Sequence, residues 1–186
     1  MRFNSPEHLE TWKRTKRYPA IHDAMFDAAG SLLRGTRVLD LGCSYGLLGS
    51  RIAKLLGYDT AIGVEADKSV ISAAEQAGVS LVFHNIRVAA DTMSQLEAII
   101  LAHGINVIIA RRIMPELFGD NLQLGADFAG MCAYCGVKEM LIEGRVLSGR
   151  STNALASIDA EVAMLTGGGA YREARRIKAV SYLQAA

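Results

Sequence analysis

Two acidic residues and a turn with two glycines have the types and spacing that could do chemistry in this 186-residue chain. The stretch RVLDLGCSYGLLGS (37–50) leads from an apolar run through Asp40 into a turn that holds Gly42 and Gly46. A second acid, Glu65, ends the next apolar run in IGVEAD. A glycine turn that opens a helix suits a nucleotide. The G-x-G-x-x-G pattern of pyrophosphate binding and the Gly-Lys-Ser/Thr ending of a P-loop are both missing from it.

The two acids indicate what the turn would hold. We place Asp40 at the mouth of the turn, where its charge would repel a polyphosphate and favour a cationic or amine-bearing ligand. A carboxylate at the end of a second strand, such as Glu65, can accept hydrogen bonds from two ribose hydroxyls. The combination predicts an adenosine moiety without a phosphate. The alternative interpretation is a tight turn followed by a solvated acid.

The elements that must position these residues follow a regular alternation. Short apolar runs predict strands at 36–42, 60–66, 79–85, 105–111 and 138–144, with amphipathic helices between them and one closing strand after residue 170. Asp91 is predicted to cap the helix before the fourth strand. The pattern predicts an α/β fold, a three-layer, open, doubly wound and mostly parallel sheet, in one domain. Residues 1–35 would form an N-terminal helical cap and residues 36–186 the Rossmann-like core.

The segments VLDLGCSYG and AIGVEAD resemble the class I S-adenosylmethionine-dependent methyltransferases. Their first motif is similar to (D/E)-x-G-x-G-x-G, and Asp40, Gly42 and Gly46 match it, whereas Ser44 stands where a middle glycine is commonest. The resemblance covers roughly residues 36 to 145 and implies S-adenosylmethionine as the cofactor. The family usually closes its sheet with two antiparallel strands, and the sequence shows one clear strand there.

The resemblance also implies roles for individual residues. Asp40 would lie near the methionine amino group, through water or the loop, and Glu65 would hold the ribose hydroxyls. Asn85, at the end of the third strand, would accept a hydrogen bond from the adenine amino group. The cofactor-binding set predicted in this way is Asp40, Gly42, Cys43, Ser44, Gly46, Glu65, Ala66, Asn85, Ile86 and Ala110, with Asp67 as a second candidate beside the adenine.

The methyl acceptor is harder to define. The fourth strand continues into ARRIMP, which differs from the (N/D)-P-P-(Y/F) motif of amine methylation on bases and has no Pro-Cys pair. Two like charges at the mouth, Arg111 and Arg112, are predicted to bind the acceptor through an anionic group, or to pair with a carboxylate such as Glu143. The acceptor is therefore expected to be a small molecule or a nucleic-acid-derived one. The alternative is a cofactor-binding or partner module without transferase activity, which the single closing strand favours, together with a homodimer formed through that edge.

Composition limits the other possibilities. The net charge of +1 argues against strong non-specific binding of nucleic acid or membranes. We interpret the basic clusters around residues 13–17 and 172–178 as solvated faces or a charged strand edge. No signal peptide or membrane-length apolar run is visible, so a cytoplasmic protein is expected.

The remaining candidates for chemistry are thiols, histidines and the N-terminal segment. Three cysteines, two of them in CAYC (132–135), are interpreted as ordinary thiols, and we predict no metal site. His84 is interpreted as a core or surface histidine, and no catalytic residue is assigned. The segment around Tyr18 and His22 is predicted to fold over the cofactor as a lid.

Overall fold

The computed structural model describes residues 17–58, 60–144, 155 and 157–186, with side chains from residue 22 onward. Its strands form one seven-stranded sheet in the order β3-β2-β1-β4-β5-β7-β6. The first five strands along the chain run parallel, and β6 and β7 are antiparallel additions beyond β5. The strands are β1 Val38–Leu41, β2 Ala61–Glu65, β3 Leu81–Asn85, β4 Val107–Arg111, β5 Glu139–Glu143, β6 Tyr171–Ile177 and β7 Val180–Ala185.

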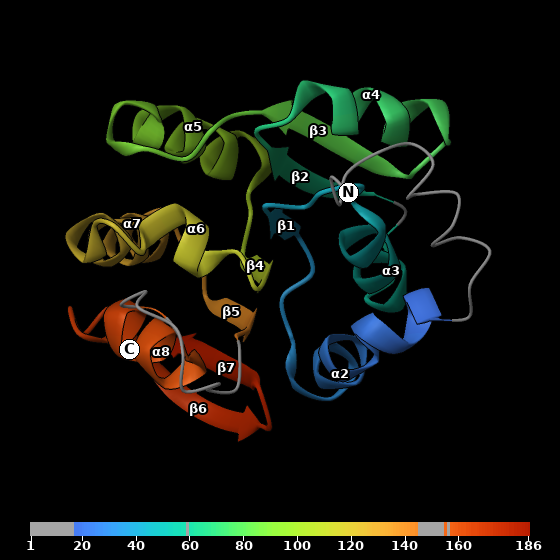
Figure 1. Ribbon diagram of the computed structural model, residues 1–186. Helices are drawn as coiled ribbons and strands as arrows, with labels where there is room; N and C mark the ends of the chain where they lie inside the picture. Colours follow the sequence, from blue (N-terminus) through green and yellow to red (C-terminus); the bar gives the residue numbers. More distant parts are fainter. Residues whose placement is uncertain (1–16, 59, 145–154, 156) are drawn as a thin grey trace.

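Helices cover both faces of the sheet, so the predicted three-layer doubly wound fold is confirmed (Figure 1). The α2–α3 side and the α5–α7–α8 side each have their own apolar cluster against the strands. The helices are α2 Arg17–Leu32, α3 Leu47–Leu55, α4 Lys68–Gln76, α5 Met93–His103, α6 Met114–Phe118, α7 Leu122–Tyr134 and α8 Ile158–Thr166.

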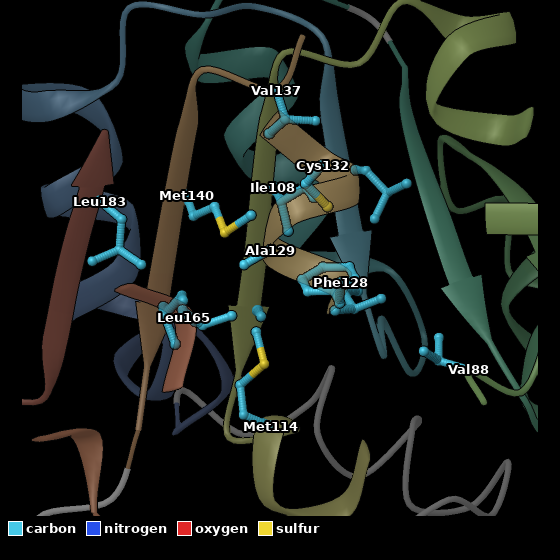
Figure 2. Close-up of a cluster of buried hydrophobic side chains, with 14 of the residues drawn as sticks. Val88, Ile108, Met114, Phe128, Ala129, Cys132, Val137, Met140, Leu165 and Leu183 are labelled. Atoms are coloured by element: carbon cyan, nitrogen blue, oxygen red, sulfur yellow. The ribbon is translucent and has the colours of Figure 1, made fainter. Parts of the chain in front are cut away.

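Side-chain alternation along the central strands fills both clusters. In β4, Val107 and Ile109 face the α2–α3 side, whereas Ile108 and Ala110 face α5, α7 and α8. Figure 2 shows the second cluster, in which Ile108 and Met140 of the strands lie near Phe128 of α7. Burial on both faces explains why these strands read as nearly continuous apolar runs in the sequence.

The N-terminal helix expected from the sequence is present as α2. Met25, Ala28 and Ala29 are fully or almost fully buried, and they join the cluster between α3 and the strands. Helix α2 therefore extends the helix layer over the β5–β7 part of the sheet. The rest of the predicted cap, residues 1–16, lies outside the described residues.

The prediction of a single closing strand is wrong. Two strands, β6 and β7, pair antiparallel across a two-residue turn at Lys178–Ala179, and Lys178 adopts a left-handed φ of 54°. A tight hairpin of this kind normally has an Asn-Gly or Asp-Gly signal, and its absence made the hairpin read as one strand. The complete strand pair therefore gives no reason to expect a partner module or an edge-to-edge homodimer.

The predicted cap at Asp91 is also wrong. A 3-10 turn occupies Ala90–Thr92, and α5 begins at Met93. Thr92 holds this turn, because its Oγ1 accepts from the Ala89 N–H at 2.9 Å and donates to the Arg87 carbonyl at 2.6 Å. Asp91 lies one residue before Thr92, and it is the Thr92 hydroxyl that makes the hydrogen bonds of this turn.

Candidate functional site

The loop between β1 and α3 takes the backbone shape that its glycines allow. Gly42, Ser44 and Gly46 all have positive φ, at 65°, 50° and 68°. A Cβ at Gly42 would overlap the side chain of Ile113, so glycine is required there for both space and conformation. Ser44 adopts the same left-handed region without being glycine, which explains physically why a glycine is commonest at this position.

Glu65 ties this loop to the end of β2. Its Oε2 accepts from the Ser44 N–H at 2.9 Å, and its Oε1 accepts from the Asp67 N–H at 2.9 Å. A carboxylate has about four acceptor sites, so two of them remain for a ligand's hydroxyls. Glu65 is thus placed as predicted, and it has an additional role in holding the loop.

Asp40 lies beneath the loop and not at its mouth, which corrects the sequence-based placement. The side chain is buried, and Oδ2 accepts from the Gly49 N–H of α3 at 2.9 Å. Burial raises the pKa of Asp40 to about 7 from its ordinary 3.8, with Glu65 adding to the rise and the Gly49 N–H opposing it. The carboxyl therefore positions α3 and the loop from behind, because its place in β1 directs it toward that helix.

Asn85 joins the ends of β2 and β3. Its Nδ2 donates to the carbonyls of Glu65 and Ala66, both at 3.0 Å. These hydrogen bonds use the amide nitrogen, which leaves the amide oxygen as the acceptor predicted for an adenine amino group. The bonds also fix the separation between the two strand ends.

A pocket of about 200 Å³ lies at the carboxyl ends of these strands, where a doubly wound sheet places its ligands. Four predicted residues line it, namely Gly42, Glu65, Ala66 and Ile86. The other lining residues were not predicted from the sequence. They are Val64, Arg87, Val88, Ile113, Glu116 and Leu117. Ile113, the residue before α6, shares one helical face with Glu116 and Leu117 by i, i+3, i+4 spacing, but this helix is too short for the pattern to be recognised in the sequence.

The other predicted residues stand behind or beside this pocket. Cys43 and Ala110 are buried in the two apolar clusters, and Gly46 is closely covered by Leu81 and Phe83. Ser44 contacts the site through the hydrogen bond that its backbone N–H donates to Glu65. Their contribution is to the shape of the loop and not to the pocket lining.

Arg111 and Arg112 both pair with Glu143, one of the two possibilities drawn from the sequence. Arg111 Nε donates to Glu143 Oε2 at 3.0 Å, and Arg112 Nε and Nη2 each lie 2.9 Å from Oε1. The Glu143 side chain is 5% exposed, against 20% for Arg111 and 50% for Arg112. Two guanidinium groups share one carboxylate, and Arg112 is the more accessible of the two.

Helix α2 brings His22 toward the same end of the sheet. His22 is buried, and its pKa is lowered to about 4 by burial, by Arg111 and by Arg51. The imidazole is therefore neutral at neutral pH. The pocket described above does not include it, so the predicted lid function is untested, and the Tyr18 side chain lies outside the described part of the chain.

The remaining reactive side chains lie apart from the pocket. Nε2 of His84 is 3.2 Å from Nε2 of His103, and burial together with His103 lowers the His84 pKa. Cys132 is buried in the core (Figure 2), and burial raises the pKa of the Cys132 and Cys135 thiols, which makes them poor nucleophiles. Among the described residues, no group of three or more His, Cys, Asp or Glu could hold a metal ion, and no helix could cross a membrane.

The fold, the glycine loop and the acid at the end of β2 together define the class I methyltransferase arrangement, and the comparisons agree. A methyltransferase-domain family model matches residues 32–165, so the chain belongs to that family. The predicted resemblance is thereby confirmed, together with S-adenosylmethionine as the cofactor of this class. No curated protein matches the sequence.

Solved structures share the fold at low identity. An S-adenosylmethionine-dependent methyltransferase from Aquifex aeolicus has a TM-score of 0.63 at 13% identity, over 98% of this chain and 99% of that one. The magnesium protoporphyrin IX methyltransferase ChlM from Synechocystis, solved with bound S-adenosylmethionine, has a TM-score of 0.59 at 16% identity, over 98% and 92%. Monomeric WbdD matches with a TM-score of 0.57 at 17% identity, over 92% of this chain but 41% of its own. This chain thus spans about two fifths of WbdD.

Proposed function

We propose that this chain transfers the methyl group of S-adenosylmethionine to an acceptor with an anionic group, and that the acceptor is a small molecule or derived from a nucleic acid. The observation that supports it most is the pairing of two sites at one end of the sheet. The pocket with Gly42 and Glu65 follows β1 and β2, and the Arg111–Glu143–Arg112 cluster follows β4 and β5.

The pocket fits the adenosine part of this cofactor. Val64, Ile86, Val88 and Leu117 supply apolar walls, and Glu65 supplies acceptor sites. The volume of about 200 Å³ is below the roughly 300 Å³ at which pockets for drug-sized ligands begin. The described residues therefore enclose part of the cofactor, and the remainder extends beyond them.

The chain's own contribution to catalysis is alignment. The bound cofactor supplies an activated methyl group, so no protein nucleophile is needed. Gly42 allows close approach of the loop backbone, Glu65 would fix the ribose, and the apolar walls would pack against the adenosine part. A base is required only for an acceptor that must lose a proton, and we assign no residue to that role.

Arg112 is the residue that we assign to the anion of the acceptor. Its side chain is half exposed, its backbone N–H donates to the Glu143 carbonyl at 2.7 Å, and its φ is 56°. A left-handed backbone at a residue other than glycine is strained, and such strain gathers at functional sites. Arg111 is more enclosed and holds Glu143 in place.

The structure favours a small acceptor as the first to be tried. In β6, Arg176 forms ion pairs with Glu173 and with Asp159, so the positive charge of Arg176 in the basic cluster at 172–178 is neutralised. Strand β6 is also the edge of the sheet opposite β3, whereas the pocket lies by β1 to β3. The basic residues at 13–16 lie outside the described residues.

The experiment is transfer of labelled methyl groups from S-adenosylmethionine to fractionated cell extract, with and without nuclease treatment. We expect label in an acidic small-molecule fraction, and an Arg112→Gln variant should lose that transfer while still binding the cofactor. Loss of the signal after nuclease treatment would identify a nucleic-acid acceptor. Cofactor binding with no labelled fraction would support the partner-module alternative and overturn the proposed activity.

A further inference from the structure

The charged side chains that line the pocket differ in whether they make hydrogen bonds or ion pairs. Three of its lining residues carry charge, namely Glu65, Arg87 and Glu116. Glu65 is engaged by two backbone N–H groups. Within the described part of the chain, neither a hydrogen bond nor an ion pair engages the side chains of Glu116 or Arg87.

Glu116 stands next to the glycine loop through Ile113. The Glu116 N–H donates to the Ile113 carbonyl at 2.9 Å, and the Ile113 side chain covers Gly42 closely. Glu116 is therefore held one helical turn from the contact between α6 and the loop. A ligand that enters beside Gly42 meets an exposed, uncompensated carboxylate on this wall.

We infer that Glu116 makes the pocket respond to the positive charge of its ligand. It favours S-adenosylmethionine, which carries a sulfonium, over S-adenosylhomocysteine, the uncharged thioether left after transfer. The inference rests on the proposed function and adds to it a residue that discriminates cofactor from product. The segment after β4 thereby contributes Glu116 to the cofactor pocket as well as Arg112 to the proposed acceptor site.

The magnitude follows from the width of the pocket, with the adenosine part inside it and the adjoining sulfonium at its edge. A volume of about 200 Å³ corresponds to a space about 7 Å across, so a charge at its edge lies within about one Debye length of Glu116. At about 7 Å and an effective dielectric constant of about 40 to 80, one unit charge changes an affinity about three- to sevenfold. An uncharged ligand of the same shape is not affected.

Arg87 provides a test of opposite sign. It lines the same pocket with the opposite charge, on the segment that follows β3. Removing the Arg87 charge must raise the preference for the sulfonium ligand by the same mechanism by which removing the Glu116 charge lowers it. A purely structural effect of either substitution would not reverse sign in this way.

The experiment is calorimetric titration of the full chain with S-adenosylmethionine and with S-adenosylhomocysteine. The variants are Glu116→Gln and Arg87→Gln, and Glu75→Gln on the exposed surface of α4 is the matched control. For Glu116→Gln we expect the ratio of the two affinities to shift about three- to sevenfold toward S-adenosylhomocysteine at low salt, and the shift to shrink in high salt. Arg87→Gln should shift the ratio the other way, and Glu75→Gln should leave it unchanged.

The outcomes separate this inference from the proposed function. If the wild-type chain binds neither ligand, the proposed function fails and the inference fails with it. If the wild-type chain binds both and Glu116→Gln leaves the ratio unchanged, or Arg87→Gln shifts it in the same direction as Glu116→Gln, the inference is overturned and the proposed function stands. Opposite shifts with an unchanged control support it.

Discussion

The loop after β1 and the turn after β4 both depend on a carboxylate, but the carboxylates act on different partners. In the loop, Asp40 and Glu65 accept from backbone N–H groups, at Gly49 and at Ser44 and Asp67. In the turn, Glu143 accepts from the side chains of Arg111 and Arg112. A backbone partner is present whatever the residue type, whereas a guanidinium partner exists only where the sequence supplies arginine.

This difference separates a general site from a specific one. A loop held through its backbone keeps its shape when neighbouring side chains change, which suits a cofactor shared by a whole family. A turn held through two arginine side chains has a charge and shape that depend on the residue types at those positions, which suits an individual acceptor. The predictions that follow test whether the two regions can be perturbed separately.

The largest effect on stability is expected from Glu143→Ala. The substitution leaves two guanidinium groups next to each other without their shared buried carboxylate. Breaking a buried ion pair costs about 3–5 kcal/mol, and the exposure of Arg112 reduces this to about 3 kcal/mol. Urea unfolding measures the loss, and Arg112→Gln, which removes the more exposed partner, is expected to lose less. A loss below that of Arg112→Gln would contradict the central role of Glu143.

Gly42→Ala should perturb the loop by about 2 kcal/mol. A Cβ there overlaps the Ile113 side chain, and the φ of 65° is unfavourable for alanine. The measurement is thermal unfolding together with cofactor titration, and cofactor affinity should fall as well. The double variant with Ile113→Ala separates the two causes, because it should recover the steric part and leave the conformational part. No recovery would show that Ile113 does not limit the space at Gly42.

Asp40 should make stability depend on pH between about 4 and 7. Its pKa is raised in the folded chain from 3.8 to about 7, so the folded state binds a proton more tightly than the unfolded state. The stability contributed by the protonated carboxyl is fully present below pH about 4 and is lost as pH rises through about 7. At about 1.4 kcal/mol per pKa unit, about 3 kcal/mol of it is lost between pH 5 and pH 8.

The variant that isolates this effect is Asp40→Asn. Its amide oxygen can still accept from the Gly49 N–H, but it does not ionise. Urea unfolding at pH 5 and pH 8 should show a smaller decline with pH for Asp40→Asn than for the wild type. An equal decline in the two proteins would refute the assignment to Asp40.

The smallest effect is expected from Ser44→Gly. Relief of a left-handed φ of 50° favours the folded state, while greater chain freedom favours the unfolded one, so the net gain is about 0.5 kcal/mol. The bond from the Ser44 N–H to Glu65 does not use the side chain and should persist. Thermal unfolding measures the gain, and a loss above about 1 kcal/mol would mean that the serine hydroxyl has a role not seen in this loop.

The sequence predicted the cofactor side better than the acceptor side, for physical reasons. The five parallel strands, Gly42 and Glu65 could be placed because strand periodicity and strand ends are local features of the chain. The i, i+3, i+4 set at Ile113, Glu116 and Leu117 was overlooked because α6 is only five residues long, too short for a periodic pattern. Asp40 was misplaced because a strand's alternation does not reveal which face lies under a helix.

The pairing of Arg111 and Arg112 with Glu143 was drawn from the sequence as one of two alternatives. It could not be decided there, because the β4–β5 register that sets Arg111 beside Glu143 joins residues 32 positions apart. The hairpin of β6 and β7 was missed because its turn residue, Lys178, adopts a left-handed φ without being glycine or asparagine. Neither feature has a local sequence signal, because long-range pairing sets the β4–β5 register and the turn at Lys178 lacks the residue types usual for a left-handed φ.

The measurement that tests the central claim most directly is calorimetric titration with S-adenosylmethionine of the wild type, Glu65→Gln and Arg112→Gln. The wild type should bind, and Glu65→Gln should bind about 10- to 100-fold more weakly because a charge-assisted hydrogen bond contributes about 1.5–3 kcal/mol. Arg112→Gln should bind as the wild type does, since Arg112 belongs to the acceptor side. Absence of binding by the wild type, or equal losses in the two variants, would contradict the division of the site into a cofactor region and an acceptor region.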